Sequence, residues 1–419
     1  MRTDKLIKEA KEIEERIKFE EKKKETDKII QLLRENYDLI IECLEDYMDL
    51  NESEQKIIAI WCLGAALHNC FDCFPYLYFN AMRGSGKTRL LKMITFFNKG
   101  NLTTAPTEAV LFRDKGLLAL DEFERMDAKE KRLLKEMLNT AYKKGLYILR
   151  TIKRKKKEGE VYEIEKYETY RPVAMANIWG MDDVLGDRCI SITLEKSNNP
   201  IKTKKMEKFD IDERMLKVRT NQNKCSLCSD VLSGDIKNIT KNWNIYINNK
   251  YKTTLTTYNT YETQITQISL IEKIIIDKLF LKIDESGLNG RTLELFFPLF
   301  LIANFLGEEV LEETINFAKK INEERKATDA ENKDVLLYKF VSELDSDLSW
   351  HSVKELTRQF KLFLGEEDEE WVNSRWFGRA LKRLNLVNDR RRIGTGREVI
   401  LNVIKAKEKI MMFKQKKDE

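Results

Sequence analysis

The 419-residue sequence predicts an α/β core, with charged helices before it and a small mixed domain after it. Three apolar runs carry this prediction, because each has the length of a buried strand and helix-like segments lie between them. The first run precedes a glycine-containing turn, and the other two end in polar residues. Strands that alternate with helices form a parallel sheet covered by helices. The runs are Tyr76–Phe79, Leu117–Leu120 and Val173–Ala176.

Length and composition bound the class of protein. The length suits two or three domains. With 42% hydrophobic and 35% charged residues, a globular protein with a heavily charged surface is expected. No run approaches the roughly 18 apolar residues of a membrane span, and the first residues are charged, unlike a signal sequence. We therefore expect a cytoplasmic protein without membrane contact.

The seven cysteines are an odd number, which argues for reduced thiols in an intracellular chain. Two C-x-x-C pairs, Cys70/Cys73 and Cys225/Cys228, could together hold zinc through four thiolates. Because the first pair lies in an apolar junction, buried thiols are the favoured interpretation. Zinc binding stays open at this point.

The region before the core, residues 1–50, is dense in Lys and Glu and predicts one or two long exposed helices. These helices are either an interaction arm or elements that only pack. Asn51 or Ser53 can cap the next helix. His68 ends that helix, and a single histidine there is interpreted as structural.

The turn after the first strand, Ala81–Thr88, has the strand–turn–helix context of a phosphate-binding loop. Its backbone N–H groups would cradle phosphate oxygens, Lys87 would reach the β- and γ-phosphates, and Thr88 would ligate Mg²⁺. Ala81 replaces the usual first glycine, a mild weakening of the motif. The alternative is an ordinary strand–turn–helix with a solvated lysine. The predicted nucleotide-binding residues are Arg83, Gly84, Ser85, Gly86, Lys87, Thr88 and Arg89.

The second strand ends in Asp121 and Glu122. An acidic pair is a weak signal alone and a strong one downstream of a phosphate-binding loop. Both carboxylates must emerge at the sheet edge that faces the loop, so we expect the two motifs on adjacent strand tips. Asp121 would hold Mg²⁺ through water, and Glu122 would polarise the attacking water.

Two alternating runs, Leu146–Ile152 and Val161–Glu168, flank a turn at Gly159, which is a hairpin pattern. In a central pore such a hairpin would grip a nucleic-acid backbone by its phosphates. The alternative is a surface hairpin whose charges keep an edge strand from aggregating. The basic residues that end its first arm are Lys153, Arg154, Lys155, Lys156 and Lys157.

Two further polar residues have candidate catalytic roles. Asn177, at the end of the third strand, can orient the attacking water. Arg188 precedes another strand and suits an arginine finger supplied to a neighbouring subunit, an effect of about 10³–10⁵ in rate. A plain surface ion pair is the alternative for Arg188.

In this order the motifs resemble those of AAA+ ATPases of mobile-element and phage replication, including helicase domains fused to primases, and more distantly MCM and superfamily-3 helicases. The resemblance spans about residues 50–325. It implies a three-layer core with a helical lid, ATP and Mg²⁺ as cofactors, DNA as partner and a hexameric homo-oligomer. The match at Gly290–Ala303 looks like the lid and makes Arg291 a second nucleotide-sensing candidate. Other segments that carry the resemblance are Thr107–Arg113, Asn139–Gly145 and Leu185–Ile190.

The expected domains are the charged helices, an ATPase core at 51–200, the lid at 201–330 and a C-terminal domain at 331–419. Within the lid, the stretch from Lys217 to about Gln267 is rich in Thr, Asn and Tyr. It departs from the family pattern and predicts a mobile or inserted loop.

The C-terminal domain predicts a winged helix: a first helix near Val335–Val341, a second opened by a capping box at Ser352–Glu355, a third at Trp371–Leu386, and two strands around Gly394. Residues 371–397 hold eight basic residues and one acid, as expected for groove and phosphate contacts. A winged helix used only for protein contacts is the alternative. The expected DNA-binding residues are Arg375, Arg379, Lys382, Arg383, Arg391 and Arg392.

These features favour an ATP-driven DNA motor, a ring-forming replicative helicase of a mobile element. Lys87, Thr88, Asp121, Glu122 and Asn177 would act within one subunit, and Arg188 on the next. One rival is an ATP-switched DNA-binding regulator or loader that does not unwind. Another is a STAND-like signalling ATPase whose winged helix binds no DNA.

Overall fold

The computed structural model describes residues 2–122, 128–156, 159–177, 183–227, 229–251, 270–330, 333–344, 349–365, 372–394 and 396–411. The chain forms two compact units, Met1–Ile321 and Asn322–Glu419. Each has its own hydrophobic core.

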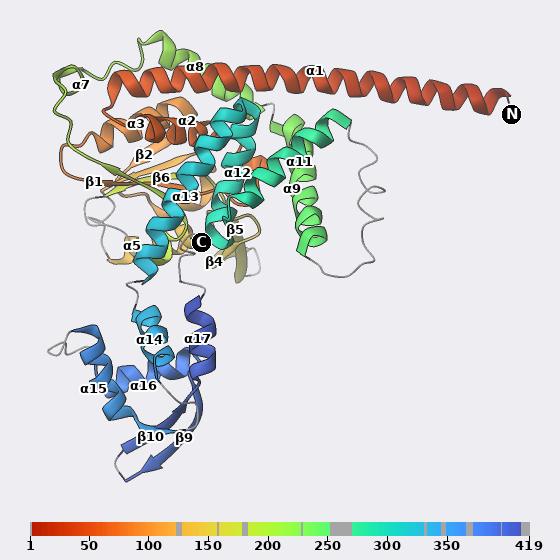
Figure 1. The fold of residues 1–419 in the computed structure, drawn as a ribbon. Coiled ribbons are helices and arrows are strands. Elements are labelled where there is room, and N and C mark those ends of the chain that lie inside the picture. Colours follow the sequence, from red (N-terminus) through yellow and green to blue (C-terminus); the bar gives the residue numbers. More distant parts are fainter. Residues whose placement is uncertain are drawn as a thin grey trace. The chain divides into compact units, whose positions relative to one another are not determined.

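A five-stranded parallel sheet forms the core of the first unit (Figure 1). Its strand order is β2-β3-β6-β1-β7. This confirms the α/β class expected from the apolar runs. The strands are β1 (Tyr76–Ala81), β2 (Asn101–Thr103), β3 (Leu118–Asp121), β6 (Val173–Asn177) and β7 (Cys189–Leu194).

Helices surround this sheet; α3 packs on β3 and β6, and α2 packs on α3 and α12. The helices of the first unit are α1 (Arg2–Tyr47), α2 (Glu52–Ala66), α3 (Lys87–Asn98), α4 (Glu108–Arg113), α5 (Ala128–Thr140), α6 (Asp183–Gly186), α7 (Pro200–Lys204), α8 (Glu213–Leu227), α9 (Ser229–Tyr251), α11 (Leu270–Glu285), α12 (Gly290–Leu306) and α13 (Glu308–Ala330), with a short 3₁₀ turn at His68–Cys70.

The sheet register brings three strand ends to one edge. Asn80 of β1 lies opposite Asn177 of β6, and Asp121 of β3 lies opposite Ala176. Because β6 runs between β1 and β3, the prediction that the loop and the acidic pair sit on adjacent strand tips is wrong. Parallel strands need long crossover connections, so neighbours in sequence need not be neighbours in the sheet.

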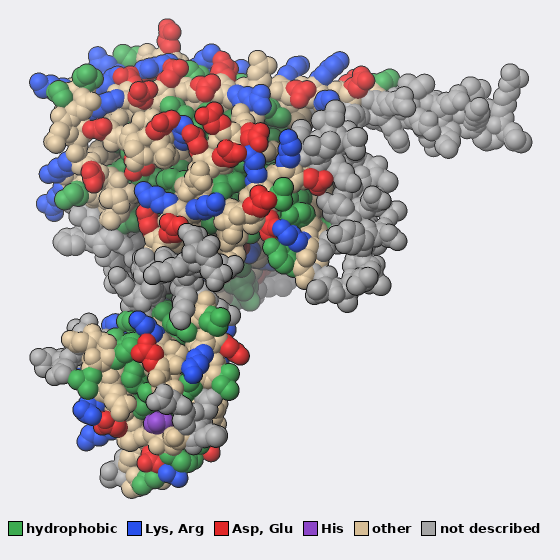
Figure 2. Space-filling model, viewed as in Figure 1, with side chains coloured by type: hydrophobic (Ala, Val, Ile, Leu, Met, Phe, Trp, Pro, Cys, Tyr) green, Lys and Arg blue, Asp and Glu red, His purple; other side chains and the backbone are tan. Residues whose placement is uncertain are grey.

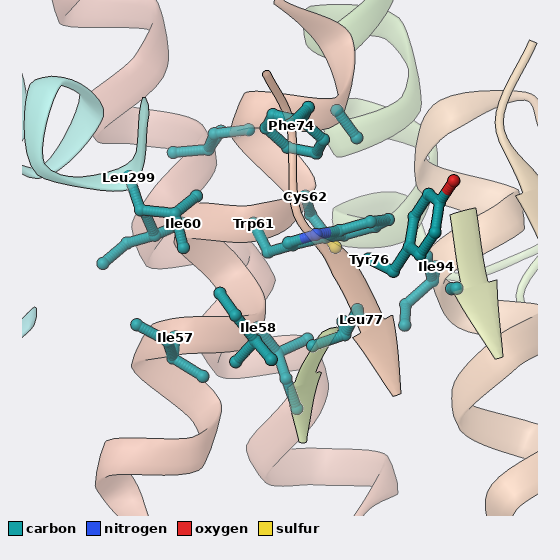
Figure 3. Close-up of a cluster of buried hydrophobic side chains, with 14 of the residues drawn as sticks. Ile57, Ile58, Ile60, Trp61, Cys62, Phe74, Tyr76, Leu77, Ile94 and Leu299 are labelled. Carbon is teal, nitrogen blue, oxygen red and sulfur yellow. The ribbon is translucent and has the colours of Figure 1, made fainter. Parts of the chain in front are cut away.

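The core of this unit is built around Trp61 of α2, which is fully buried among aliphatic and aromatic side chains (Figure 3). Its indole N–H donates to the carbonyl of Pro75 at 2.9 Å, so the polar atom of this large side chain is satisfied. The contact fixes α2 against the chain that enters β1. The strand that leads into the glycine-containing turn is thereby held on a rigid support.

The helices that precede the central sheet agree with those expected from the sequence. The charged N-terminal segment is the single helix α1. Asn51 caps α2 in a reciprocal capping box with Glu54, as expected from one of the two candidate caps. His68 follows the end of α2, and its Nδ1 lies 2.8 Å from the Ala65 carbonyl oxygen, which agrees with a structural role.

The stretch predicted as a loop from Lys217 to about Gln267 is largely helical, so this prediction is wrong for α8 and α9. Apolar residues at helical spacing bury one face of each helix, and this periodicity outweighs the Asn- and Thr-rich composition. Residues 252–269 lie outside the described part. The buried residues are Met215, Val218, Cys225, Leu232, Ile236, Ile239 and Trp243.

The predicted hairpin is present as a separate two-stranded antiparallel sheet. It pairs β4 (Tyr147–Lys156) with β5 (Gly159–Glu168) from Tyr147↔Glu168 to Lys156↔Gly159. The connecting residues Lys157 and Glu158 lie outside the described residues.

The second unit combines helices with a three-stranded antiparallel sheet ordered β8-β10-β9. Its second helix begins after Ser352, but the predicted capping box does not form, because Glu355 pairs with Arg358 at 2.7 Å instead. The third helix is shorter than predicted, and Trp371 lies outside the described residues. The elements are α14 (Lys333–Ser342), β8 (Trp350–Ser352), α15 (Val353–Leu364), α16 (Ser374–Arg383), β9 (Val387–Ile393), β10 (Gly396–Leu401) and α17 (Val403–Met411).

The surface of the first unit mixes acidic and basic side chains over the face seen in Figure 2. Within the described residues, no helix has the length and apolar character needed to cross a bilayer. The six described cysteines are buried and form no disulfide, and Cys228 lies outside the described residues. No cluster of three His, Cys, Asp or Glu side chains suited to a metal occurs among the described residues.

Candidate functional site

The turn after β1 depends on two glycines for its backbone conformation. Gly84 and Gly86 have φ of 77° and 85°, in the left-handed region that favours glycine. A Cβ at Gly86 would also approach the Met48 side chain to 3.1 Å. Ala81, by contrast, is a buried residue of β1 paired with Leu194, and it is absent from the positive-φ residues. The missing first glycine therefore leaves the turn itself intact.

Lysine and carboxylates meet at the end of this turn. Lys87 opens α3 and is only 7% exposed; its Nζ lies 3.1 Å from Glu122 Oε1 and 3.7 Å from Asp121 Oδ1. The Thr88 hydroxyl donates to Asp121 Oδ2 at 2.5 Å. The structure therefore brings together the four residues predicted from two separate motifs, although a strand intervenes between them.

Two buried oxygens at this place find no hydrogen-bond partner among the described residues: Asp121 Oδ1 and Ser85 Oγ. Buried polar atoms in folded proteins are nearly always satisfied, so an unsatisfied carboxylate oxygen beside a lysine indicates a place for a ligand. Carboxylate and hydroxyl oxygens are what Mg²⁺ prefers. The donor set of Asp121 and Thr88 fits Mg²⁺ accompanied by phosphate.

Glu122 has a strained backbone, with φ of 52° for a residue that carries a Cβ. Its N–H donates to the Ala176 carbonyl at 3.1 Å, which fixes the chain just past β3 against β6. Such strain persists only where the surroundings enforce it, and it clusters at functional sites. The carboxylate of Glu122 is thus aimed by the sheet edge.

Asn177 lies at the same edge, between the tips of β1 and β3. Its Oδ1 accepts a hydrogen bond of 2.5 Å from the Tyr78 hydroxyl. Because that oxygen is the amide's only acceptor atom, the bond sets which way the Asn177 amide points. Tyr78 is a positioning residue that the sequence did not suggest, since nothing in an apolar strand marks one tyrosine as special.

Lys87, Thr88 and Glu122 border a cleft of about 690 Å³, large enough for a nucleotide. Much of its lining comes from segments that no motif marks: the end of α1, the chain after β7, and α7. Sequence reasoning missed them because they meet only through the fold. The lining residues outside the two motifs are Tyr47, Met48, Asp49, Ser197, Lys202, Thr203 and Glu207.

Arg89, which is predicted from the sequence to contact the nucleotide, lies at the cleft with its guanidinium engaged by protein atoms. Its guanidinium donates to the carbonyls of Tyr47, Lys202 and Lys205 at 3.3, 2.9 and 2.8 Å. It borders the cleft, and besides these backbone contacts its Nε lies 3.5 Å from Glu207 Oε1. Arg89 thus joins the segments at the ends of α1 and α7, which form one wall of the cleft. Arg83 also lines the cleft, and its side chain is exposed.

A cluster of charges next to Tyr47 fixes α1 to the segment before α8. Arg214 bridges Asp46 at 2.7 Å and Asp212 at 2.9 Å. Hydrogen bonding to Lys205 first, and then to Arg214, lowers the pKa of Asp46. Burial and the nearby Asp212 raise the pKa of Tyr47 to about 12. This side of the cleft is therefore held in a charged and ordered form at neutral pH.

Arg188 and Arg291 lie away from Lys87. Arg188 precedes β7, whose first residue Cys189 pairs with the first residue of β1, so it lies at the opposite edge of the sheet. Arg291 donates to Asp187 at 3.0 Å, and both guanidinium groups lie over the Tyr142 ring, at 5.1 and 5.2 Å. Arg291 thus contacts Asp187 and the Tyr142 ring rather than the Lys87 cluster, and its assignment as a nucleotide-sensing residue stays a prediction. The hydrophobic pattern predicted the helix α12, but it gave no sign of which edge of the central sheet the first turn of this helix lies against.

The basic residues of the hairpin occupy the distal part of β4. Lys153 is exposed, and Arg154, Lys155 and Lys156 continue the strand, while Lys157 is outside the described residues. In the second unit all the predicted DNA-binding residues are exposed on α16 and β9. Two of them have acidic partners: Arg383 with Asp334 at 2.5 Å, and Arg391 with Glu398 at 2.7 Å. Ion pairing reduces what these two offer a phosphate.

No family model matches the chain, and comparison with curated proteins gives no significant match. What the site does is therefore inferred from its residues and their geometry. Those residues combine a glycine turn, a buried lysine, a hydroxyl and two carboxylates at one sheet edge.

Proposed function

We propose that this protein is an ATP-hydrolysing DNA motor, a ring-forming AAA+ helicase of the kind that replicates mobile elements. One observation carries the proposal: Lys87, Thr88, Asp121 and Glu122 converge beside a turn with two left-handed glycines. This is the set that phosphoryl transfer needs, because its catalysis is positioning and charge stabilisation. Hydrolysis of MgATP is the activity that the set supports best.

The chain's own residues have separable roles in this proposal. Backbone N–H groups of the turn and of α3 bind phosphate oxygens, and Lys87 binds the terminal phosphates. A triphosphate competes with the carboxylates for the Lys87 ammonium, so its binding would leave Glu122 able to accept a proton from water. Asn177, oriented by Tyr78, would position that water. Mg²⁺ held by Thr88 and Asp121 would neutralise charge on the β- and γ-phosphates.

The location of Arg188 supports action between subunits. It lies at the sheet edge away from its own Lys87, and its described partners are the Val184 carbonyl, at 2.5 Å, and the Tyr142 ring. No described carboxylate pairs with it, so it keeps its charge for an anion. In a head-to-tail ring this edge would meet the nucleotide of the next copy.

The proposed contacts with DNA come from two places. The basic run Lys153–Lys157 on the hairpin would hold the backbone of one strand, and the second unit, as a winged helix, would bind duplex through α16 and β9. Arg375, Arg379 and Lys382 suit phosphate contacts better than Arg383 and Arg391, whose charges are already paired.

The test of the motor measures ATP turnover and displacement of one strand from a forked duplex by the full chain. We expect DNA to stimulate turnover and ATP to drive displacement. Alanine at Lys153–Lys157 should keep basal turnover and remove stimulation, while alanine at the exposed Lys23, Lys24 and Lys28 of α1 should change neither. Unchanged stimulation in the hairpin variant refutes the hairpin's role. Stimulation without displacement favours a loader or regulator.

A salt titration separates the motor from a signalling ATPase that ignores DNA. Replacing Arg375, Arg379 and Lys382 by alanine should weaken duplex binding uniformly across sequences and flatten the slope of log affinity against log salt by about one unit for each lost phosphate contact. A wild-type chain whose duplex binding has no salt slope would favour the signalling alternative.

A further inference from the structure

The two faces of the β4–β5 hairpin differ in chemistry. Side chains alternate along each strand, so every second residue points to the same side. On the inner face, Ile148 is buried, Tyr167 stacks on Phe112 at 5.1 Å, and Arg150 pairs with Glu136 at 2.6 Å. These contacts anchor the base of the hairpin to α4 and α5 and fix which side is outer.

The outer face carries exposed apolar side chains. Leu149, Ile164 and Tyr162 are 60%, 72% and 67% exposed, the reverse of what burial of apolar surface favours. The register places Thr151 opposite Ile164 and Lys153 opposite Tyr162, so the three form one diagonal stripe toward the turn. Inner contacts already hold the hairpin, so this stripe has no part in anchoring it.

Charged side chains of both signs occur on the hairpin: the outer face also carries the exposed Glu168 at its base, and the inner face carries Arg150. Lys153 and Lys166 are exposed on the outer face, and the Lys166 ammonium lies 3.6 Å from the centroid of the Tyr147 ring. Glu163 and Glu165 point to the inner face by the alternation of β5. Apolar and aromatic side chains bordered by lysines, leading to a basic run, are what a single-stranded nucleic acid binds: rings for its bases and cations for its phosphates.

We propose that the stripe Leu149–Ile164–Tyr162 contacts the bases of a single strand, with Tyr162 as the stacking residue. This inference rests on the proposed function and adds the substrate class: an unpaired strand recognised through its bases as well as its backbone. In a duplex the base faces are covered by their neighbours. Adjacent outer positions lie about 6.7 Å apart, twice the roughly 3.4 Å repeat of stacked bases, so the strand is held extended.

A second copy of the chain fits this stripe less well. A stable protein interface buries about 800 Å² on each partner. Three side chains of at most about 250 Å² each do not reach that area, and the basic residues beside them would repel the same face of another copy.

The probes are an oligothymidine and an abasic oligomer of equal length, which carry the same phosphates but differ in bases. The readouts are half-saturation of the stimulated ATP turnover and direct binding by the full chain. We expect the wild type to bind the abasic strand at least tenfold more weakly. Tyr162→Ala should bind oligothymidine as weakly as the wild type binds the abasic strand, with basal turnover unchanged, and Tyr162→Phe should retain binding.

Tyr251→Ala is the matched control, because it removes a similarly exposed tyrosine, 63%, from α9. Equal binding of both strands by the wild type overturns the stacking role and leaves the motor standing. Failure of every strand to stimulate overturns the proposed function and this inference with it. A Tyr162→Ala variant whose native mass falls would assign the stripe to contact between copies and also overturn the inference.

Discussion

The two edges of the central sheet handle positive charge in different ways. At the edge where β1 and β3 end, Lys87 is buried between two carboxylates. At the opposite edge, Arg188 rests on the Tyr142 ring and a carbonyl, with no described acidic partner. A lysine paired with acids can release them when an anionic ligand arrives, whereas an arginine on a ring is held in place with its charge intact. The arrangement around Lys87 suits a ligand bound by the same chain, and the arrangement around Arg188 suits a ligand bound by a neighbouring chain.

The largest expected effect is at the first edge. Lys87→Ala removes the side chain predicted to bind the β- and γ-phosphates of its own chain's nucleotide and leaves Asp121 and Glu122 without their shared cation, so we expect no ATP turnover above background. Steady-state phosphate release measures it. Lys92→Ala, on the same helix but paired with Glu207 at its surface, should stay near wild type. Turnover of more than a tenth of wild type in Lys87→Ala would contradict the site.

The second expected effect tests whether the two edges serve one nucleotide. Arg188→Ala should lower turnover by about 10³-fold while nucleotide binding persists. Mixing it with Lys87→Ala should restore part of the activity, because some interfaces then combine an intact Lys87 with an intact Arg188. Titration of one variant into the other measures this. Absence of any recovery at all ratios would place Arg188 outside the neighbouring site.

The third effect concerns fine positioning at the first edge. Tyr78→Phe removes the hydroxyl that orients Asn177, and we expect kcat to fall about tenfold with KM nearly unchanged. Tyr76→Phe is the control, since it also loses a buried hydrogen bond, to the Leu138 carbonyl at 2.7 Å, but its hydroxyl bonds only that backbone oxygen and not Asn177. Each should lose about 1 kcal/mol of stability. An equal fall of kcat in both would mean that Tyr78 acts through stability alone.

The last effect is on stability at the second edge and leaves turnover at neutral pH unchanged. Burial lowers the pKa of His68 to about 4, with help from the charges of Lys144 and Arg171. In the unfolded chain His68 takes up a proton below about pH 6.5, whereas in the folded chain it does so only near pH 4. The free energy of unfolding therefore decreases as the pH is lowered from about 6.5 to about 4. Urea unfolding at neutral pH and at pH 4.5 measures this. Between the two pH values, the free energy of unfolding of His68→Gln should decrease by about 1–3 kcal/mol less than that of the wild type. Parallel curves would show a histidine that titrates normally.

The sequence predicted the parts of the first edge that depend on local chain geometry. Glycines with left-handed φ, a lysine at a helix start and acids at a strand end are marked by residue type, so Gly84, Gly86, Lys87, Asp121 and Glu122 were found. Asn51 was found for the same reason, since a capping box closes within one turn.

What the sequence could not predict depends on contacts between distant segments. The crossover that places β6 between β1 and β3 leaves no local trace, and neither does the bond from Tyr78 to Asn177. Arg89 and Arg291 were assigned to the nucleotide because their neighbours in sequence belong to motifs, and their contacts with backbone carbonyls and with Asp187 left no trace in those motifs. The helices α8 and α9 were missed because composition was weighed above periodicity.

Ala81 has a practical consequence for the recognition of such sites. It lies in β1 with Leu194 beside it, so its position asks for a small strand residue, not for a backbone that only glycine can adopt. A search pattern that insists on glycine there would discard chains whose loops are intact. A pattern built on the residues equivalent to Gly84 and Gly86, and on an acidic strand end downstream, would retain them.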